Sequence, residues 1–121
     1  MPPNAAGLFM VGFPGPTPSP DAAALVREGV SGVIYFRRNL GEGPAGAARL
    51  TADLQRLARD AGRPPLLVAA DQEGGIVARL RAPFTEYPGA DAVGLAGDEG
   101  LAERVGRAIA AELRAVGITV D

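Results

Sequence analysis

The sequence lacks three residue types on which much enzyme chemistry depends: cysteine, histidine and lysine. Without cysteine, the chain can form neither a disulfide framework nor a thiolate metal site. Without histidine, Ser-His-Asp and Cys-His catalysis, histidine zinc sites and histidine acid–base chemistry are excluded. Without lysine, Walker-A phosphate binding and Schiff-base chemistry are excluded as well.

Long apolar runs and an excess of positive charge are also absent. The net charge is −2 and every one of the 12 basic residues is arginine, so we predict no nucleic-acid partner. No apolar run approaches the roughly 20 residues that cross a bilayer, so no membrane partner is expected either. Residues 1–4 lack the basic region that opens a secretory signal, which favours a cytoplasmic location; the alternative is a secreted protein from which a leader was removed.

Short apolar runs alternate with helical patterns along the 121 residues, a length that suits one domain. Four apolar runs without polar alternation predict strands that are buried on both faces, at 8–13, 32–36, 66–71 and 118–121. Three amphipathic segments predict helices, at 20–29 behind the N-cap Ser19, at 44–61, and at 98–117 behind Asp98. The segments 37–41 and 72–97 are predicted to be loops.

This β-α-β-α-β-α-β order predicts an α/β fold with parallel strands and helical crossovers. A flavodoxin-like sheet of about five βα units often fits this length, whereas a closed barrel needs eight units and about 250 residues. The long loop at 72–97 uses the residues that further units would need, so we predict the N-terminal half of a TIM-like barrel. Because half a barrel exposes a strand edge and apolar faces, we expect self-association or pairing with the missing half.

Ligands of parallel α/β folds bind at the carboxyl ends of the strands. Four places there qualify, at 14–18, 37–39, 71–79 and Asp121. The segment beginning at Asp71 is the most informative, because an acidic residue that closes an apolar strand needs a hydrogen-bonding partner or a ligand. We predict that Glu73 braces this loop, and that Gly74 and Gly75 allow a sharp turn or a close backbone approach.

A second carboxylate, Asp121, ends the strand expected to lie beside the one that ends at Asp71. Neighbouring strands are about 4.8 Å apart, so the two carboxylates could approach the roughly 5–5.5 Å spacing of a retaining glycosidase. The sequence does not fix their orientation, and this geometric hypothesis therefore remains open at this point.

Arginines supply positive charge near the same end of the sheet. Arg37, Arg38 and Arg79 could clamp a carboxylate or phosphate in a bidentate manner. They could equally neutralise Asp71 and Glu73, and we favour this structural role. Asn39, which follows the arginine pair, belongs to the same predicted loop.

Residues 70–80, ADQEGGIVARL, resemble the signature loop of glycoside hydrolase family 3, and most closely that of bacterial β-N-acetylglucosaminidases (β-N-acetylhexosaminidases). Three further stretches are similar to the family in the same order, namely 32–39 (GVIYFRRN), 84–90 (FTEYPGA) and 112–121 (ELRAVGITVD). The likeness runs over nearly the whole chain.

The resemblance implies a TIM-like barrel that hydrolyses terminal β-linked sugars with retention, through a covalent glycosyl-enzyme, with no metal or organic cofactor. It implies that Asp71 binds hydroxyls of the terminal sugar and that Asp121 belongs to a strand end. Arg79 matches a family position without a catalytic role, and it remains, with Arg38, Asn39, Glu73, Gly74 and Gly75, possible support for the site loops.

In this branch of the family the nucleophile is an Asp far downstream, the general acid–base is a His paired with an Asp, and a Lys-His pair helps hold the sugar. The resemblance therefore implies a fragment of an enzyme that cleaves terminal N-acetylglucosamine from cell-wall muropeptides or chitin-like glycans. It places the catalytic nucleophile and the His acid–base outside this chain, which we expect to be inactive alone.

Two other functions are compatible with parts of the pattern. A non-catalytic sugar-binding or assembly module of the same ancestry would keep Asp71 without the catalytic groups. A phosphoacceptor domain would also place an Asp at a strand end, but it needs an acidic pair after the first strand and a late lysine. After its first predicted strand the chain has Phe13, Pro14 and Gly15 instead of an acidic pair, and it has no lysine. Both features argue against that function.

Overall fold

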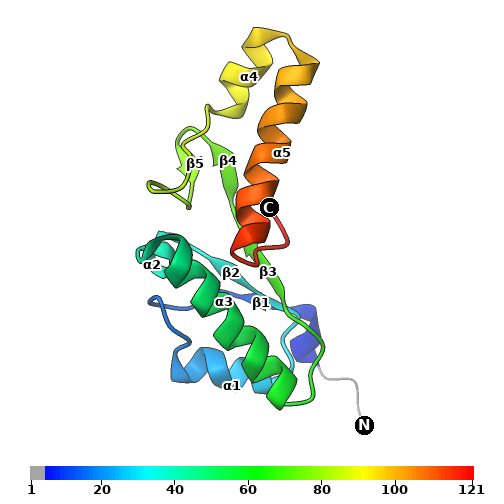
Figure 1. The fold of residues 1–121 in the computed structure, drawn as a ribbon. Helices are drawn as coiled ribbons and strands as arrows, with labels where there is room; N and C mark the ends of the chain where they lie inside the picture. Colours follow the sequence, from blue (N-terminus) through cyan, green and yellow to red (C-terminus); the bar gives the residue numbers. More distant parts are fainter. Residues whose placement is uncertain (1–4) are drawn as a thin grey trace.

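The computed structural model describes residues 5–121 (Figure 1). Residues 1–4, on which the prediction about a secretory signal rests, lie outside the described part. In chain order the elements are η1 (Ala5–Leu8), β1 (Met10–Val11), α1 (Pro20–Glu28), β2 (Gly32–Tyr35), α2 (Arg37–Leu40), α3 (Gly43–Asp60), β3 (Leu67–Ala70), β4 (Gln72–Gly74), β5 (Val77–Ala78), α4 (Ala90–Ala96) and α5 (Glu99–Ala115).

The central sheet is parallel and has the strand order β1-β2-β3. After α5 the chain returns to this sheet, where Val120 forms a parallel bridge with Ala69. The Thr119 N–H also donates to the Val68 carbonyl at 2.8 Å. The predicted succession of parallel strands joined by helices is therefore confirmed, with the fourth strand reduced to a single bridge.

Helices α1 and α3 lie side by side and pack against the sheet (Figure 1). The start of α1 is capped by Ser19, whose Oγ accepts from the Ala22 N–H at 3.2 Å, and its end by Gly29 at φ 101°. Leu50 and Leu54 form the apolar stripe of α3 and are buried against the strands. Both helices follow the boundaries that the sequence predicts.

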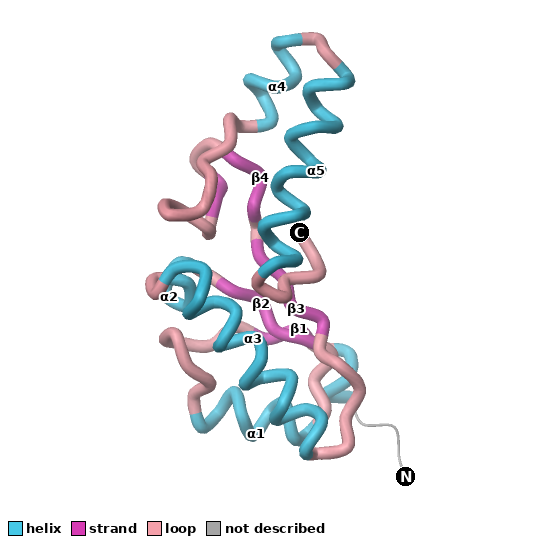
Figure 2. The backbone as a smooth tube through the Cα atoms, in the orientation of Figure 1, coloured by secondary structure: helices cyan, strands magenta, loops and turns pink. Residues whose placement is uncertain are grey.

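The other part of the chain, with the β4–β5 hairpin, α4 and α5, extends away from α1 and α3 (Figure 2). Asp98 caps α5 by accepting from the Leu101 N–H at 3.1 Å. Ile109 and Leu113, in the C-terminal half of α5, are buried, whereas Leu101 in the first turns is only partly covered. The apolar stripe of α5 is therefore half covered by the described residues.

Three predictions about local structure are wrong. The run 8–13 is not one buried strand, because Leu8 ends η1 and only Met10 and Val11 form β1 at the sheet edge, while Leu8 and Phe9 are 85% and 59% exposed. The expected loop 37–41 contains the single-turn helix α2, which Asn39 stabilises by accepting from the Phe36 N–H. The expected loop 72–97 contains the β4–β5 hairpin and α4.

None of the helices in residues 5–121 combines the length and the apolar character that crossing a membrane requires.

One buried hydroxyl pair makes the stability of the fold depend on alkaline pH. Tyr35 and Thr51 are hydrogen bonded at 3.0 Å between β2 and α3, and Tyr35 is fully buried. Burial raises the pKa of Tyr35 from 10.0 to about 12, and the hydrogen bond to Thr51 offsets only part of this shift. Because the folded pKa is the higher one, the stabilisation is complete below pH 10 and is lost as the pH rises through 12.

We therefore expect the free energy of unfolding to fall by about 1.4 kcal/mol between pH 9 and pH 11, since one pKa unit corresponds to about 1.4 kcal/mol. Urea denaturation at the two pH values measures this difference. In Tyr35→Phe, which has no phenol to ionise at this position, the fall should be smaller by that amount. An equal fall in both proteins would contradict the assignment.

Candidate functional site

Asp71 directly follows β3, at the carboxyl end of the parallel sheet, as the sequence predicts. Its side chain is 43% exposed, and Oδ2 accepts from Arg79 Nη2 at 2.8 Å. The arginine is the more buried partner, with 25% of its side chain exposed. The carboxylate is thus held from one side while it stays accessible from solvent, which is the arrangement that a hydrogen-bonding ligand requires.

The β4–β5 hairpin brings Arg79 back to Asp71. Its two strands are antiparallel, with Gln72 opposite Ala78 and Gly74 opposite Val77. Because the hairpin is short, Arg79, which follows β5, lies beside Asp71, which precedes β4. The ion pair therefore depends on the hairpin keeping its register.

Gln72 locks the hairpin with a buried side-chain amide that is only 3% exposed. Its Oε1 accepts from the backbone N–H groups of Arg79 and Leu80, both at 2.9 Å. Its Nε2 donates to the Leu80 carbonyl at 3.1 Å. One side chain thus satisfies backbone groups on both sides of Arg79, and this holds the arginine next to Asp71.

The bracing role predicted for Glu73 belongs to Gln72 instead. Along β4, Gln72 and Gly74 point inward and are buried, while Glu73 points outward and is exposed. Within residues 5–121, Glu73 makes no hydrogen bond or ion pair. Successive side chains of a strand point to opposite faces. Recognising a short strand after Asp71 would therefore have shown that Gln72 and Glu73 point in opposite directions.

The glycine pair behaves as the sequence predicts. Gly74 and Gly75 have φ values of 84° and 56°, in the left-handed region that favours glycine. A Cβ atom on Gly74 would lie 2.2 Å from the Pro88 carbonyl oxygen. The Gly75 N–H donates to the Tyr87 carbonyl at 2.9 Å. The pair therefore lets the hairpin dock closely against the segment that leads into α4.

Asn39 joins the loop after β1 to the end of β2. Its side chain is 1% exposed, and Nδ2 donates to the carbonyls of Phe13 and Gly15 at 3.0 and 2.7 Å. Its Oδ1 accepts from the Phe36 N–H at 2.8 Å. Asn39 thereby ties together two of the loops that lie at the carboxyl end of the sheet.

The Phe36 ring lies between this loop and the Asp71 site. The Arg38 guanidinium is 4.6 Å from the ring centroid, and that of Arg79 is 5.8 Å from it. Arg38 Nε also donates to the Phe13 carbonyl at 3.0 Å. Arg38 therefore supports the loops, while Arg79 is held by an aromatic face and by the Asp71 carboxylate.

Asp121 does not form a catalytic pair with Asp71 in this geometry. Its Oδ1 accepts from the Gln72 backbone N–H at 2.7 Å. Each carboxylate thus has its own partner. Asp121 accepts from the Gln72 backbone N–H, and Asp71 accepts from Arg79. This position agrees with the strand-end role that the family resemblance implies.

Within residues 5–121, no three Asp or Glu side chains come together in a way that could hold a metal ion. The chemistry that the described residues offer at this edge is hydrogen bonding by a carboxylate and by guanidinium groups.

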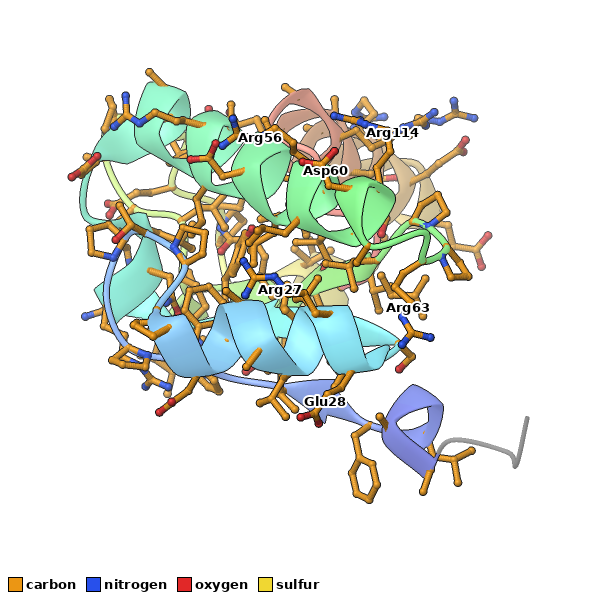
Figure 3. The ribbon with its side chains drawn as sticks, turned by 90° about the horizontal axis from the view of Figure 1, so that it is seen from below. Arg27, Glu28, Arg56, Asp60, Arg63 and Arg114 are labelled. Carbon is orange, nitrogen blue, oxygen red and sulfur yellow. The ribbon has the colours of Figure 1, made fainter. Side chains whose placement is uncertain are left out.

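Other arginines lie at helix ends and have structural roles. Arg63 lies beside the C-terminal end of α1 (Figure 3), where its Nε donates to the Arg27 carbonyl at 2.9 Å. The same view shows Arg56 near Asp60 on α3 and Arg114 on α5. Positive side chains at helix C-termini balance the helix dipole, so these residues need no ligand to explain them.

Parallel strands joined by helical crossovers, with polar side chains at their carboxyl ends, are the architecture of (β/α) barrels and of open α/β sheets. The model of the glycosyl hydrolase family 3 N terminal domain matches residues 6–121, and the chain belongs to this family. The fold is half of a TIM-like barrel, as the sequence predicts.

Curated relatives and solved structures agree with this assignment. A Beta-hexosaminidase of Nitrosomonas eutropha is 43% identical over 98 residues, which cover 76% of this chain and 27% of that protein. One from Methylobacillus flagellatus is 45% identical over 95 residues, which cover 74% and 26%. The chain thus spans about a quarter of the length of the curated relatives that it matches.

Among solved structures, a glycoside hydrolase family 3 beta-N-acetylglucosaminidase from Paenibacillus sp. superposes with a TM-score of 0.91. It is 46% identical, and the match covers 96% of this chain and 22% of that one. Native NagZ from Neisseria gonorrhoeae gives a TM-score of 0.74 at 30% identity, with coverage of 90% and 33%. Strand order and helix placement are therefore shared with family members of known structure.

Proposed function

We propose that this chain supplies part of the sugar-binding site of a retaining glycosidase that releases terminal β-linked N-acetylglucosamine from cell-wall or chitin-like glycans. The observation that carries the proposal is the placement of Asp71, which is accessible at the carboxyl end of the sheet and paired with Arg79 at 2.8 Å. Relatives named Beta-hexosaminidase and a solved beta-N-acetylglucosaminidase support the choice of sugar.

Asp71 would bind the sugar by accepting hydrogen bonds from its hydroxyl groups. An ionised carboxylate has about four lone-pair sites, and the Arg79 Nη2 contact occupies one side of Oδ2. Hydrogen bonds to a charged group contribute about 1.5–3 kcal/mol each. The role of Arg79 is to fix the orientation of the carboxylate.

Catalysis would come from groups that these 121 residues do not contain. The family resemblance implies a His acid–base and a downstream Asp nucleophile, and the chain has no histidine. We therefore expect the purified chain to release no phenol from an aryl N-acetylglucosaminide above the rate of a protein-free blank. Turnover by the chain alone would overturn this part of the proposal.

The alternative is a non-catalytic sugar-binding or assembly module. It is favoured by the combination of an accessible Asp71 with the lack of histidine and lysine. Adding a full-length family relative that lacks its own Asp at this position distinguishes the two, because only a chain that completes a catalytic site would restore turnover. Sugar binding without restoration would support the module.

Exposed apolar side chains point to a partner that carries further strands of the barrel, or to a second copy of the chain. Leu8 and Phe9 are exposed at the β1 edge, and Leu95 of α4 is 89% exposed. A groove of about 590 Å³ between α4 and α5 is lined by apolar residues such as Val93 and Ile109. We expect light scattering to show association at high concentration, whereas a clean monomer would contradict it.

A further inference from the structure

Three arginines converge on a small pocket beside the Asp71 site. The pocket has a volume of about 290 Å³ and is lined by Arg37 of α2, by Arg79 and Arg81 after β5, and by backbone from the α2–α3 connection. No Asp or Glu is among its lining residues.

Two of these arginines carry buried donors without an acceptor. The Nε atoms of Arg79 and Arg81 are shielded from water and donate to no acceptor in the part of the chain that the structure describes. A buried donor left without an acceptor costs about 1–3 kcal/mol. In a native protein each such atom needs an explanation, for example local strain, a catalytic role, or an ion or water that accepts from it.

The nearby carboxylates do not neutralise the pocket. Arg79 is paired with Asp71 at 2.8 Å, and Arg81 has a looser pair with Glu86 at 3.6 Å. Arg37 is exposed and forms no ion pair or hydrogen bond with residues 5–121. One full positive charge therefore remains at the pocket.

The start of α3 adds a backbone donor to the same corner. Gly43 is the first residue of this 18-residue helix and lines the pocket. The N-cap residue Glu42 makes no side-chain capping hydrogen bond and instead pairs with Arg49. Gly43, at φ 70°, has a backbone N–H at the pocket, whereas Pro44 has none, and the positive end of the helix dipole favours an anion there.

We propose that this pocket, which we name the arginine corner (Arg37, Arg79, Arg81 and Gly43), binds an oxyanion of the phosphate or carboxylate class. A guanidinium matches both groups because its planar fork can donate two parallel hydrogen bonds. Both Nε donors are shielded from solvent in this structure, so each guanidinium must rotate before the oxyanion can accept a hydrogen bond from its Nε. It is held by Arg37 and by the start of α3 from the other side.

The arginine corner shares Arg79 with the Asp71 site, so the bound oxyanion lies next to the proposed sugar. It would come either from free phosphate or from a carboxylate on an acidic saccharide. Arg81 has a second, structural contact, because its Nη2 donates to the Gly75 carbonyl at 2.9 Å. That contact leaves its Nε without an acceptor, and it explains how the guanidinium is held at the edge of the corner.

The test is a titration of the ¹⁵N-labelled 121-residue chain with inorganic phosphate and, separately, with acetate, at constant ionic strength set with chloride. We expect saturable shifts of the backbone amides of Gly43 and Arg81 with at least one of the two anions. The anion that binds more tightly identifies the source. The two reporter amides lie outside the Asp71 site and the titration contains no sugar, so failure of the glycosidase proposal would not affect this readout.

Arg37→Ala is the main variant, because Arg37 is exposed and without a partner in residues 5–121, and its removal should leave the fold intact. We expect it to weaken anion binding at least about tenfold, which corresponds to the loss of one charged hydrogen bond. Arg81→Lys, which keeps the charge but removes the Nε donor, should also weaken binding.

Arg59→Ala is the matched control, since Arg59 is an exposed arginine at the opposite end of α3. It removes the same charge and should leave the affinity unchanged. Absence of saturable shifts with both anions would overturn the proposal. An equal loss of affinity in Arg59→Ala and Arg37→Ala would also overturn it, because it would show only the effect of net charge.

Discussion

Replacing Gln72 by leucine is expected to lower the free energy of unfolding by about 3 kcal/mol or more, since each buried backbone group left unsatisfied costs about 1–3 kcal/mol. Leucine keeps a similar volume but has no partner for the N–H groups of Arg79 and Leu80 or for the Leu80 carbonyl. The loss should open the hairpin and release Arg79 from Asp71. Urea denaturation and the exchange rates of the two amides measure both effects.

The neighbouring residue offers a matched control for this prediction. Glu73→Leu changes an exposed side chain that has no hydrogen bond within residues 5–121. It should alter the stability by less than about 0.5 kcal/mol, as surface substitutions usually do. If the two variants unfold at the same urea concentration, the buried amide does not hold the hairpin.

Gly74→Ala is expected to be at least as damaging, with a loss of about 3 kcal/mol or more. The new methyl group would lie 2.2 Å from the Pro88 carbonyl oxygen, where only the backbone itself can move. The φ of 84° adds strain of about 1–3 kcal/mol for a residue with a side chain. We expect local unfolding of the segment around residues 74–89, measured as a loss of amide protection.

A glycine-to-alanine substitution at a site without close neighbours serves as the control, because it adds the same methyl group without the steric clash. Gly106 lies within α5, and nothing lies within 4 Å of a Cβ built there. Gly106→Ala should raise the stability by about 0.5–1 kcal/mol because alanine favours helix. Equal stability changes in the two variants would show that the close approach at Pro88 has no energetic consequence.

The helices that have strong local signals could be predicted from the sequence. The Ser19 cap and Gly29 fix the ends of α1, and the Asp98 cap fixes the start of α5. The order of parallel strands followed from the alternation of apolar runs and helices. These features depend on residues close together in the chain, so the sequence pattern contains the information.

The elements that the sequence did not predict depend on tertiary partners. The hairpin in 72–97 is short and lacks apolar periodicity, and its register rests on the contact between Gln72 and Leu80. Leu8 and Phe9 are exposed because they lie before β1, in and just after η1, and an apolar run does not reveal where the strand begins. Propensity and periodicity report neither of these effects.

The candidate site was predictable in part. Asp71 stood out because it is a charge at the end of an apolar strand, and Arg79 because a buried or half-buried carboxylate needs a partner. The sequence could not show that Asp121 accepts from the Gln72 N–H, since side-chain orientation at a strand end is set by its neighbours. It also gave no sign of Arg81, whose position depends on the loop after β5.

The central claim is that the Asp71 carboxylate binds a sugar at the carboxyl end of the sheet. The most direct test is a titration of the ¹⁵N-labelled chain with N-acetylglucosamine, for wild type and for Asp71→Asn, which keeps the shape but removes the charge. We expect saturable shifts of the Gln72 and Arg79 amides at millimolar sugar, and affinity at least about tenfold weaker in the variant. No response at millimolar sugar, or equal affinity in the two proteins, would contradict the account.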